Sequence, residues 1–93
     1  MGTEPETFAH FLAAVAAQDD EEAESLVPAL DREAASRLLR LAHAADPNIR
    51  WWSVRALADC GDGDAVAVIS ERLRDDDPAI RATAALRAWT SIY

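Results

Sequence analysis

One five-residue motif occurs twice in this chain, 31 positions apart, and it constrains the fold more than any other feature. The first copy is Asp46, Pro47, Asn48, Ile49 and Arg50, and the second is Asp77, Pro78, Ala79, Ile80 and Arg81. Aspartate accepts hydrogen bonds from the free amides at the start of a helix, and proline is tolerated at the first helical position because no donor is needed there. The motif therefore predicts a helix start at each copy and a structural unit that repeats.

The rest of the chain also favours helix, because alanine and leucine are abundant and glycine is scarce. Apolar spacing and breakers predict about six helices in an all-α chain. The first is expected to run to about residue 18 and the last from about 78 to 92, and Asp19, Asp31, Asp46 and Asp62 are expected to begin the four helices between them. Gly61 is expected to end the fourth helix in the left-handed conformation, so that a short loop turns the fourth and fifth helices into an antiparallel pair.

Between and within the two motif copies, the chain resembles the HEAT-like repeats of bacteria, including those of the phycobilisome-lyase type. The matching positions are Leu73, Asp75, Asp77, Pro78, Ile80 and Arg81. The resemblance implies a right-handed α-solenoid of antiparallel helix pairs. It also implies that Asp75 and Arg81, six positions apart, belong to the aspartate–arginine ladder that links neighbouring repeats. The first copy has Ala44 where this aspartate would stand.

A chain of 93 residues provides one core, so residues 1–93 are expected to form a single domain. Residues 31–93 hold the repeat units. Residues 1–30 match nothing in the repeat and are expected to form N-terminal cap helices. This segment contains seven acidic residues and no basic residue.

The net charge of −8 disfavours a nucleic-acid partner, because phosphate binding needs clustered positive charge. No apolar stretch approaches the roughly 20 residues that cross a bilayer, and the acidic N-terminus differs from a secretory signal. The single cysteine, Cys60, fits a reducing compartment. We therefore expect a cytoplasmic protein.

Catalytic and metal-binding patterns are missing from the sequence. His10 and His43 are too few and too isolated for a metal site. Cys60 has no adjacent base and occupies a slot that usually holds a buried leucine, so it is expected to behave as a small apolar side chain. We expect no catalytic residue, no metal and no cofactor.

Trp51 is the most informative candidate for an interface. Helical periodicity places Trp52 in the core and turns Trp51 toward the opposite face, where it either packs against the preceding repeat or anchors a partner. Inner helices usually line the concave side of such a stack, which would expose four arginines to an acidic partner. These are Arg37, Arg40, Arg72 and Arg74.

The last helix carries two apolar stripes, although a terminal repeat normally turns a polar face outward. One stripe contains Ile80, Ala84, Ala88 and Ile92, and the other contains Leu86, Trp89 and Tyr93. Three explanations for this apolar surface are open. The chain is a fragment of a longer solenoid, the stripe is buried in a homodimer, or the stripe is a partner site. We favour self-association or truncation, with Trp89, Ile92 and Tyr93 as interface candidates.

The function expected from these patterns is a non-catalytic, protein-binding scaffold whose partner the sequence does not identify. The resemblance leaves a second function open, namely a subunit or fragment of a bilin lyase-like protein. A third, nucleic-acid binding as in HEAT-like DNA glycosylases, would need a basic stripe, which the acidity of the chain disfavours.

Overall fold

The computed structural model describes residues 5–92, with side chains from residue 6 to residue 89. Within this part of the chain the structure consists of six α-helices and one 3₁₀ turn, without a β-strand. The elements are α1 (Pro5–Ala16), α2 (Asp20–Leu26), η1 (Val27–Ala29), α3 (Arg32–Leu41), α4 (Pro47–Cys60), α5 (Gly63–Arg72) and α6 (Pro78–Ile92). The prediction of an all-α, HEAT-like architecture is confirmed.

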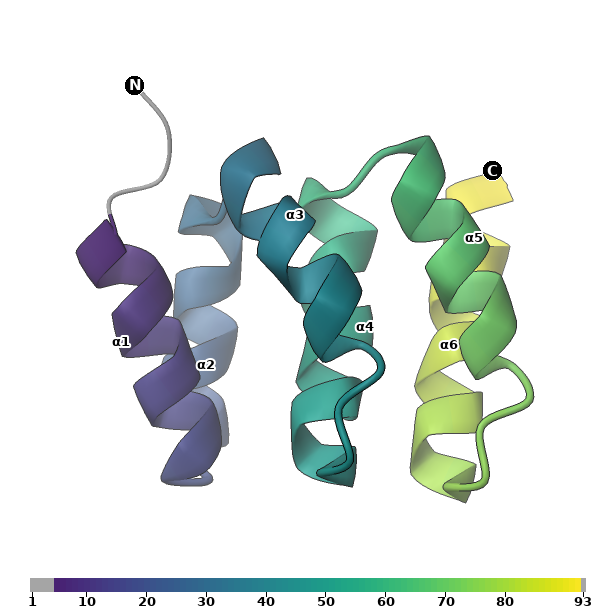
Figure 1. Ribbon diagram of the computed structural model, residues 1–93, viewed down its shortest axis with the longest axis horizontal. Coiled ribbons are helices and arrows are strands. Elements are labelled where there is room, and N and C mark those ends of the chain that lie inside the picture. Colours follow the sequence, from purple (N-terminus) through teal and green to yellow (C-terminus); the bar gives the residue numbers. More distant parts are fainter. Residues whose placement is uncertain (1–4, 93) are drawn as a thin grey trace.

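The helices form three hairpins that stand side by side (Figure 1). In that view α1, α3 and α5 lie in front, and α2, α4 and α6 lie behind them. The turns inside the three hairpins, at residues 17–19, 42–46 and 73–77, all lie along the lower edge. Each hairpin therefore runs in the same direction, and one face of each pair is available to the next.

Aspartate caps explain why the helices begin where they do. The Asp46 carboxylate accepts a hydrogen bond from the backbone N–H of Asn48 at 2.8 Å, and Asp77 accepts one from Ala79 at the same distance. Pro47 and Pro78 are the first residues of α4 and α6, as the repeated motif predicts. The same kind of cap starts three further helices, through Asp19, Asp31 and Asp62.

Gly61 does not adopt the left-handed conformation expected from the sequence, so that prediction is wrong. Its φ of −88° and ψ of 177° are extended values, which deliver the chain directly to the cap residue Asp62. Glycine is required here for space. A Cβ at this position would collide with the Cβ of Ala65 and lie 2.7 Å from the carbonyl oxygen of Leu57. Any larger residue would separate α4 from α5.

A continuous apolar core runs through all three hairpins, and α4 lies at its centre. Trp52, predicted to be core, is only 4% exposed and meets the ring of Phe11 edge-on, with centroids 6.2 Å apart. Asn48 ties the same two hairpins together, because its side-chain amide donates to the carbonyl oxygen of Val15 at 2.8 Å. The N-terminal hairpin is thus packed and hydrogen-bonded onto the repeat units.

The second and third hairpins are joined by one buried ion pair. The Arg50 guanidinium donates two hydrogen bonds of 3.0 Å to the Asp75 carboxylate, and it also reaches the carbonyl oxygens of Ala44 and Ala45. The side chains are only 12% and 2% exposed. The resemblance implies that Asp75 and Arg81 are ladder residues, but within residues 6–89 the Arg81 guanidinium donates to the backbone carbonyl oxygen of Asp75, at 2.8 Å, and the Asp75 carboxylate accepts from Arg50. The ladder step runs forward, from Arg50 in one unit to Asp75 in the next.

The protonation of Asp75 follows from this geometry. Burial raises the pKa of its carboxyl, but hydrogen bonds from Arg50 and from the Asp77 backbone N–H outweigh burial and lower the pKa from 3.8 to about 2. The folded state therefore binds the proton more weakly than the unfolded chain. The resulting stabilisation is present above the unfolded pKa of about 3.9 and is lost as the pH falls through the folded pKa near 2.

We predict that Asp75→Asn lowers the free energy of unfolding by about 3 kcal/mol at pH 7, because it leaves the largely buried Arg50 charge with the exposed Asp76 carboxylate as its counter-charge. Urea denaturation followed by circular dichroism measures this. Asp76→Asn is the matched control, since Asp76 also contacts Arg50 but its side chain is 95% exposed, and its loss should stay within about 0.5 kcal/mol.

The two variants should also differ in their response to acid. Asp76→Asn should keep the fall in stability between pH 4 and pH 2, whereas Asp75→Asn should show a shallower fall over the same interval. Equal losses in the two variants at pH 7 would refute a special role for the buried pair.

Candidate functional site

A groove of about 680 Å³ lies between α2, α4 and α6. Trp51 and Trp52 form its aromatic wall, and their rings meet edge-on with centroids 4.8 Å apart. Trp52 is buried and fixed by the core, whereas Trp51 is half-buried. The structure therefore places Trp51 at the wall of an open groove, supported from behind by a second indole. The other lining residues are Asp20, Glu21, Glu24, Pro47, Asn48, Asp77, Ala79 and Ile80.

The charge of the groove is negative, because four carboxylates line it and no basic residue does. Two of them are engaged: Glu24 receives hydrogen bonds from Arg55 at 2.6 and 3.1 Å, and Asp77 caps α6. Asp20 and Glu21 lie exposed in the first turn of α2. These two carboxylates are exposed to a ligand, and their negative charge favours a cationic one.

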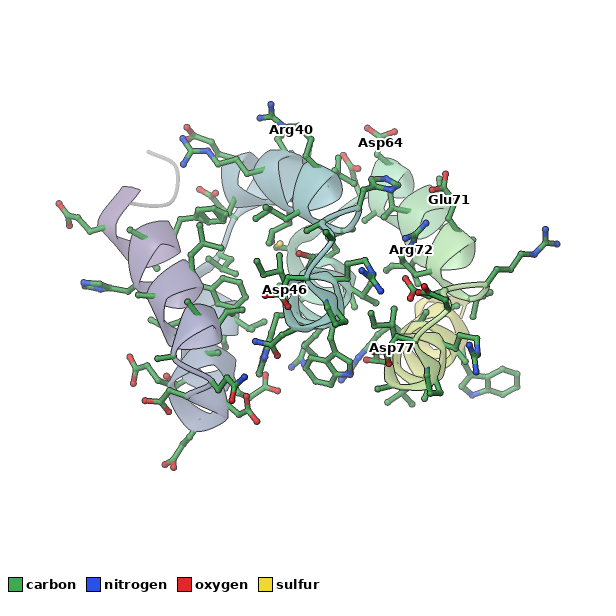
Figure 2. All side chains as sticks on the ribbon, turned by 60° about the horizontal axis from the view of Figure 1, so that its bottom comes forward. Arg40, Asp46, Asp64, Glu71, Arg72 and Asp77 are labelled. Atoms are coloured by element: carbon green, nitrogen blue, oxygen red, sulfur yellow. The ribbon has the colours of Figure 1, made fainter. Side chains whose placement is uncertain are left out.

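This groove lies on the α2–α4–α6 side, whereas the sequence expectation put the binding surface on α3 and α5. Figure 2 brings the lower edge of Figure 1 forward and shows Asp46 and Asp77 at the starts of α4 and α6. Arg40, Asp64 and Glu71 lie along the α3–α5 side, away from them. Sequence reasoning missed the contribution of α2, because only the packing of the first hairpin brings residues 20–24 beside α4.

The four arginines expected on one concave surface have separate environments. Arg37 lies over the ring of Phe8, 5.5 Å from its centroid, and shares a smaller groove with Arg40. Arg72 donates to the Asp75 carboxylate at 3.3 Å. Arg74 is exposed in the turn that follows α5. The structure brings Arg37 and Arg40 together at α1 and α3, and it places Arg72 beside the buried ion pair.

The two stripes of α6 differ in burial. Ile80 and Ala84 are buried against the preceding helices, and Ala88 is half-buried. On the opposite side Leu86 is 52% exposed and Trp89 is 62% exposed. The side chains of the interface candidates Ile92 and Tyr93 lie outside the described residues. The described part of this face thus presents large apolar side chains to solvent.

Cys60 behaves as an apolar residue in its environment. Burial raises the pKa of its thiol from 9.0 to about 11, so the reactive thiolate is scarce at neutral pH. Within residues 6–89, no three histidine, cysteine or acidic side chains come close enough to hold a metal ion. The described helices also include none with the length and apolar character of a membrane span.

Comparison with known proteins agrees with this architecture. The family model for HEAT repeats matches residues 3–89, which includes the first two hairpins and most of the third. Neither the curated proteins nor the solved structures include one that matches the chain. The repeated Asp-Pro helix starts, the stacked hairpins and the forward Arg50–Asp75 pair are thus found in a sequence that fits the family model over most of its length. The chain belongs to the HEAT repeat family.

Proposed function

We propose that this protein is a non-catalytic scaffold that binds a partner protein through the α2–α4–α6 groove. HEAT repeats generally serve as surfaces for protein interaction. The observation that carries the proposal is the half-buried Trp51 at the wall of an open, acidic groove. Tryptophan dominates the energetic centres of protein interfaces because its large ring covers much apolar area at a small entropic cost.

The chemistry of the groove selects a basic partner segment. A lysine or arginine side chain can lie over the Trp51 ring and gain about 0.5–1 kcal/mol from the attraction of a cation to an aromatic face. The same side chain can reach the carboxylates of Asp20 and Glu21. This partner differs from the acidic partner expected for Arg37, Arg40, Arg72 and Arg74, because carboxylates and no arginine line this groove.

We predict that a tetra-arginine peptide binds this groove and changes tryptophan fluorescence on titration. The double variant Asp20→Asn, Glu21→Gln should weaken binding about fivefold, because it removes two exposed charges worth roughly 0.5 kcal/mol each. The matched control is Glu33→Gln, Asp64→Asn, which changes the net charge equally at exposed positions on α3 and α5. Equal weakening by both pairs would show that the peptide responds only to overall charge.

Trp51→Ala separates an anchoring role from a core role. If Trp51 is an anchor, the Trp51→Ala variant should lose peptide binding, while its free energy of unfolding falls by no more than about 2 kcal/mol. A loss above about 3 kcal/mol, in the range of fully buried aromatics, would identify the residue as core and end the anchor interpretation. Thermal and urea unfolding of the variant supply this measurement.

A second role, self-association through α6, is favoured by the exposure of Leu86 and Trp89. Isolated exposed apolar residues are ordinary, but two large ones on one face of α6 form the kind of patch that associates. We predict a concentration-dependent increase in mass during sedimentation equilibrium of the purified protein. A strict monomer at the highest concentration would rule this role out.

The proposal also covers the role of the N-terminal segment and the location of the protein in the cell. Residues 1–30 act as N-terminal cap helices in a single domain, and the protein works in the cytoplasm. Similarity to lyase-type repeats in particular, and a bacterial origin, stay predictions of the sequence analysis.

A further inference from the structure

The 31-residue repeat identifies which face of α6 is prepared to pack against another helix. Arg50 and Val54 of α4 correspond to Arg81 and Ala85 of α6, and Ala58 corresponds to Trp89. In α4 this face meets the next hairpin, because Arg50 bonds to Asp75 and Val54 is fully buried. In α6 all three equivalent residues are exposed.

The exposed stripe on α6 is self-complementary. Arg81, Ala85 and Trp89 are spaced by four residues, so they lie along one side of the helix. The helical rise puts Arg81 and Trp89 about 12 Å apart with Ala85 midway. If two such helices cross in antiparallel fashion at Ala85, each Arg81 opposes the Trp89 of the other copy. A small residue at the crossing lets the helices approach to about 8–10 Å.

We propose that two copies of this chain associate through α6 about a twofold axis at Ala85, with Arg81 of each copy stacked on Trp89 of the other. The proposal rests on the self-association proposed above and specifies its geometry. Such an interface uses the same patch on both subunits and closes at two, as most homodimers do. Each guanidinium is attracted to one indole face, so the contact occurs twice per dimer.

Electrostatics favours this face over the rest of the surface. The chain carries 17 acidic residues, yet none occurs in residues 78–93. Two copies with a net charge of −8 each repel at most approaches, whereas the charged residues of α6 are two arginines, Arg81 and Arg87. Leu86, 52% exposed, borders the stripe and adds apolar area to the contact. A second copy therefore meets the least acidic face with its own least acidic face.

A residue swap tests the geometry in the full chain by sedimentation equilibrium. Trp89→Arg places Arg opposite Arg81 in both halves of the interface and should raise the dimer Kd at least tenfold. Adding Arg81→Trp to the same chain restores both pairs with exchanged positions and should return the Kd to within about threefold of the unmodified protein. Both positions are exposed, and Arg81→Trp removes one hydrogen bond to the Asp75 carbonyl oxygen, so thermal unfolding should show that each variant is folded, with a small loss of stability in the double variant.

Cross-linking gives an independent measurement. In a Cys60→Ser background, Ala85→Cys should form an intermolecular disulfide on mild oxidation, because the twofold axis brings residue 85 of both copies together. Ala67→Cys, exposed on α5, is the control and should stay reduced under the same conditions.

The outcomes separate the two proposals. A monomeric unmodified protein would overturn self-association and this geometry together. A dimer that survives Trp89→Arg, a double variant that stays as weak as Trp89→Arg alone, or cross-linking at position 67 as fast as at position 85 would overturn this geometry and leave self-association standing.

Discussion

The buried pair between Arg50 and Asp75 is the interaction on which the stacking of the helix pairs depends. Burying two charges is costly, so this contact is tolerated only because both groups are also hydrogen-bonded elsewhere. Arg50 donates to two backbone carbonyls of its own hairpin turn, and Asp75 accepts from the N–H of Asp77. The Arg50 side chain thereby closes the turn of its own hairpin and fixes the position of the turn in the next hairpin. The direction of this step follows, because the carboxylate that Arg50 contacts lies in the following unit.

That directionality also relates the groove beside Trp51 to the exposed face of α6. Toward the N-terminus, the first hairpin packs through Phe11 against Trp52, and its α2 places carboxylates beside Trp51. Toward the C-terminus, Arg81 occupies the position of Arg50 and bonds its own turn, but its contact with a following carboxylate is absent from the described residues. The groove thus forms where the first hairpin meets the repeat units, and the exposed helix face lies on α6.

The sequence predicts most of the fold because its strongest signals are local. Asp46-Pro47 and Asp77-Pro78 act within one helical turn, so the helix starts can be identified without knowledge of the tertiary structure. Gly61 was misjudged because its role depends on the close approach of Ala65 and not on backbone conformation alone. Arg50 is recognisable as a motif residue, but its acceptor Asp75 lies 25 positions further along the chain. Only the tertiary packing brings the two side chains into contact.

The candidate site was predictable only in part, for the same reason. Trp51 could be singled out because helical periodicity turns it away from the core stripe that contains Trp52. Its acidic neighbours Asp20 and Glu21 could not, because they come from a segment without the repeat motif and reach α4 only through tertiary packing. The sequence groups Arg37, Arg40, Arg72 and Arg74 by helix, although Arg74 lies in the turn after α5 and Arg72 donates to the Asp75 carboxylate.

A double-mutant cycle on the buried pair tests the central claim most directly. Arg50→Met and Asp75→Asn, alone and together, would be compared by urea denaturation at pH 7. Linkage of the hairpins by this pair predicts a coupling energy of about 1.5 kcal/mol or more, because each single variant leaves the other group buried without its partner. Additive losses, with a coupling energy within about 0.3 kcal/mol of zero, would show that the hairpins are held together by apolar packing alone.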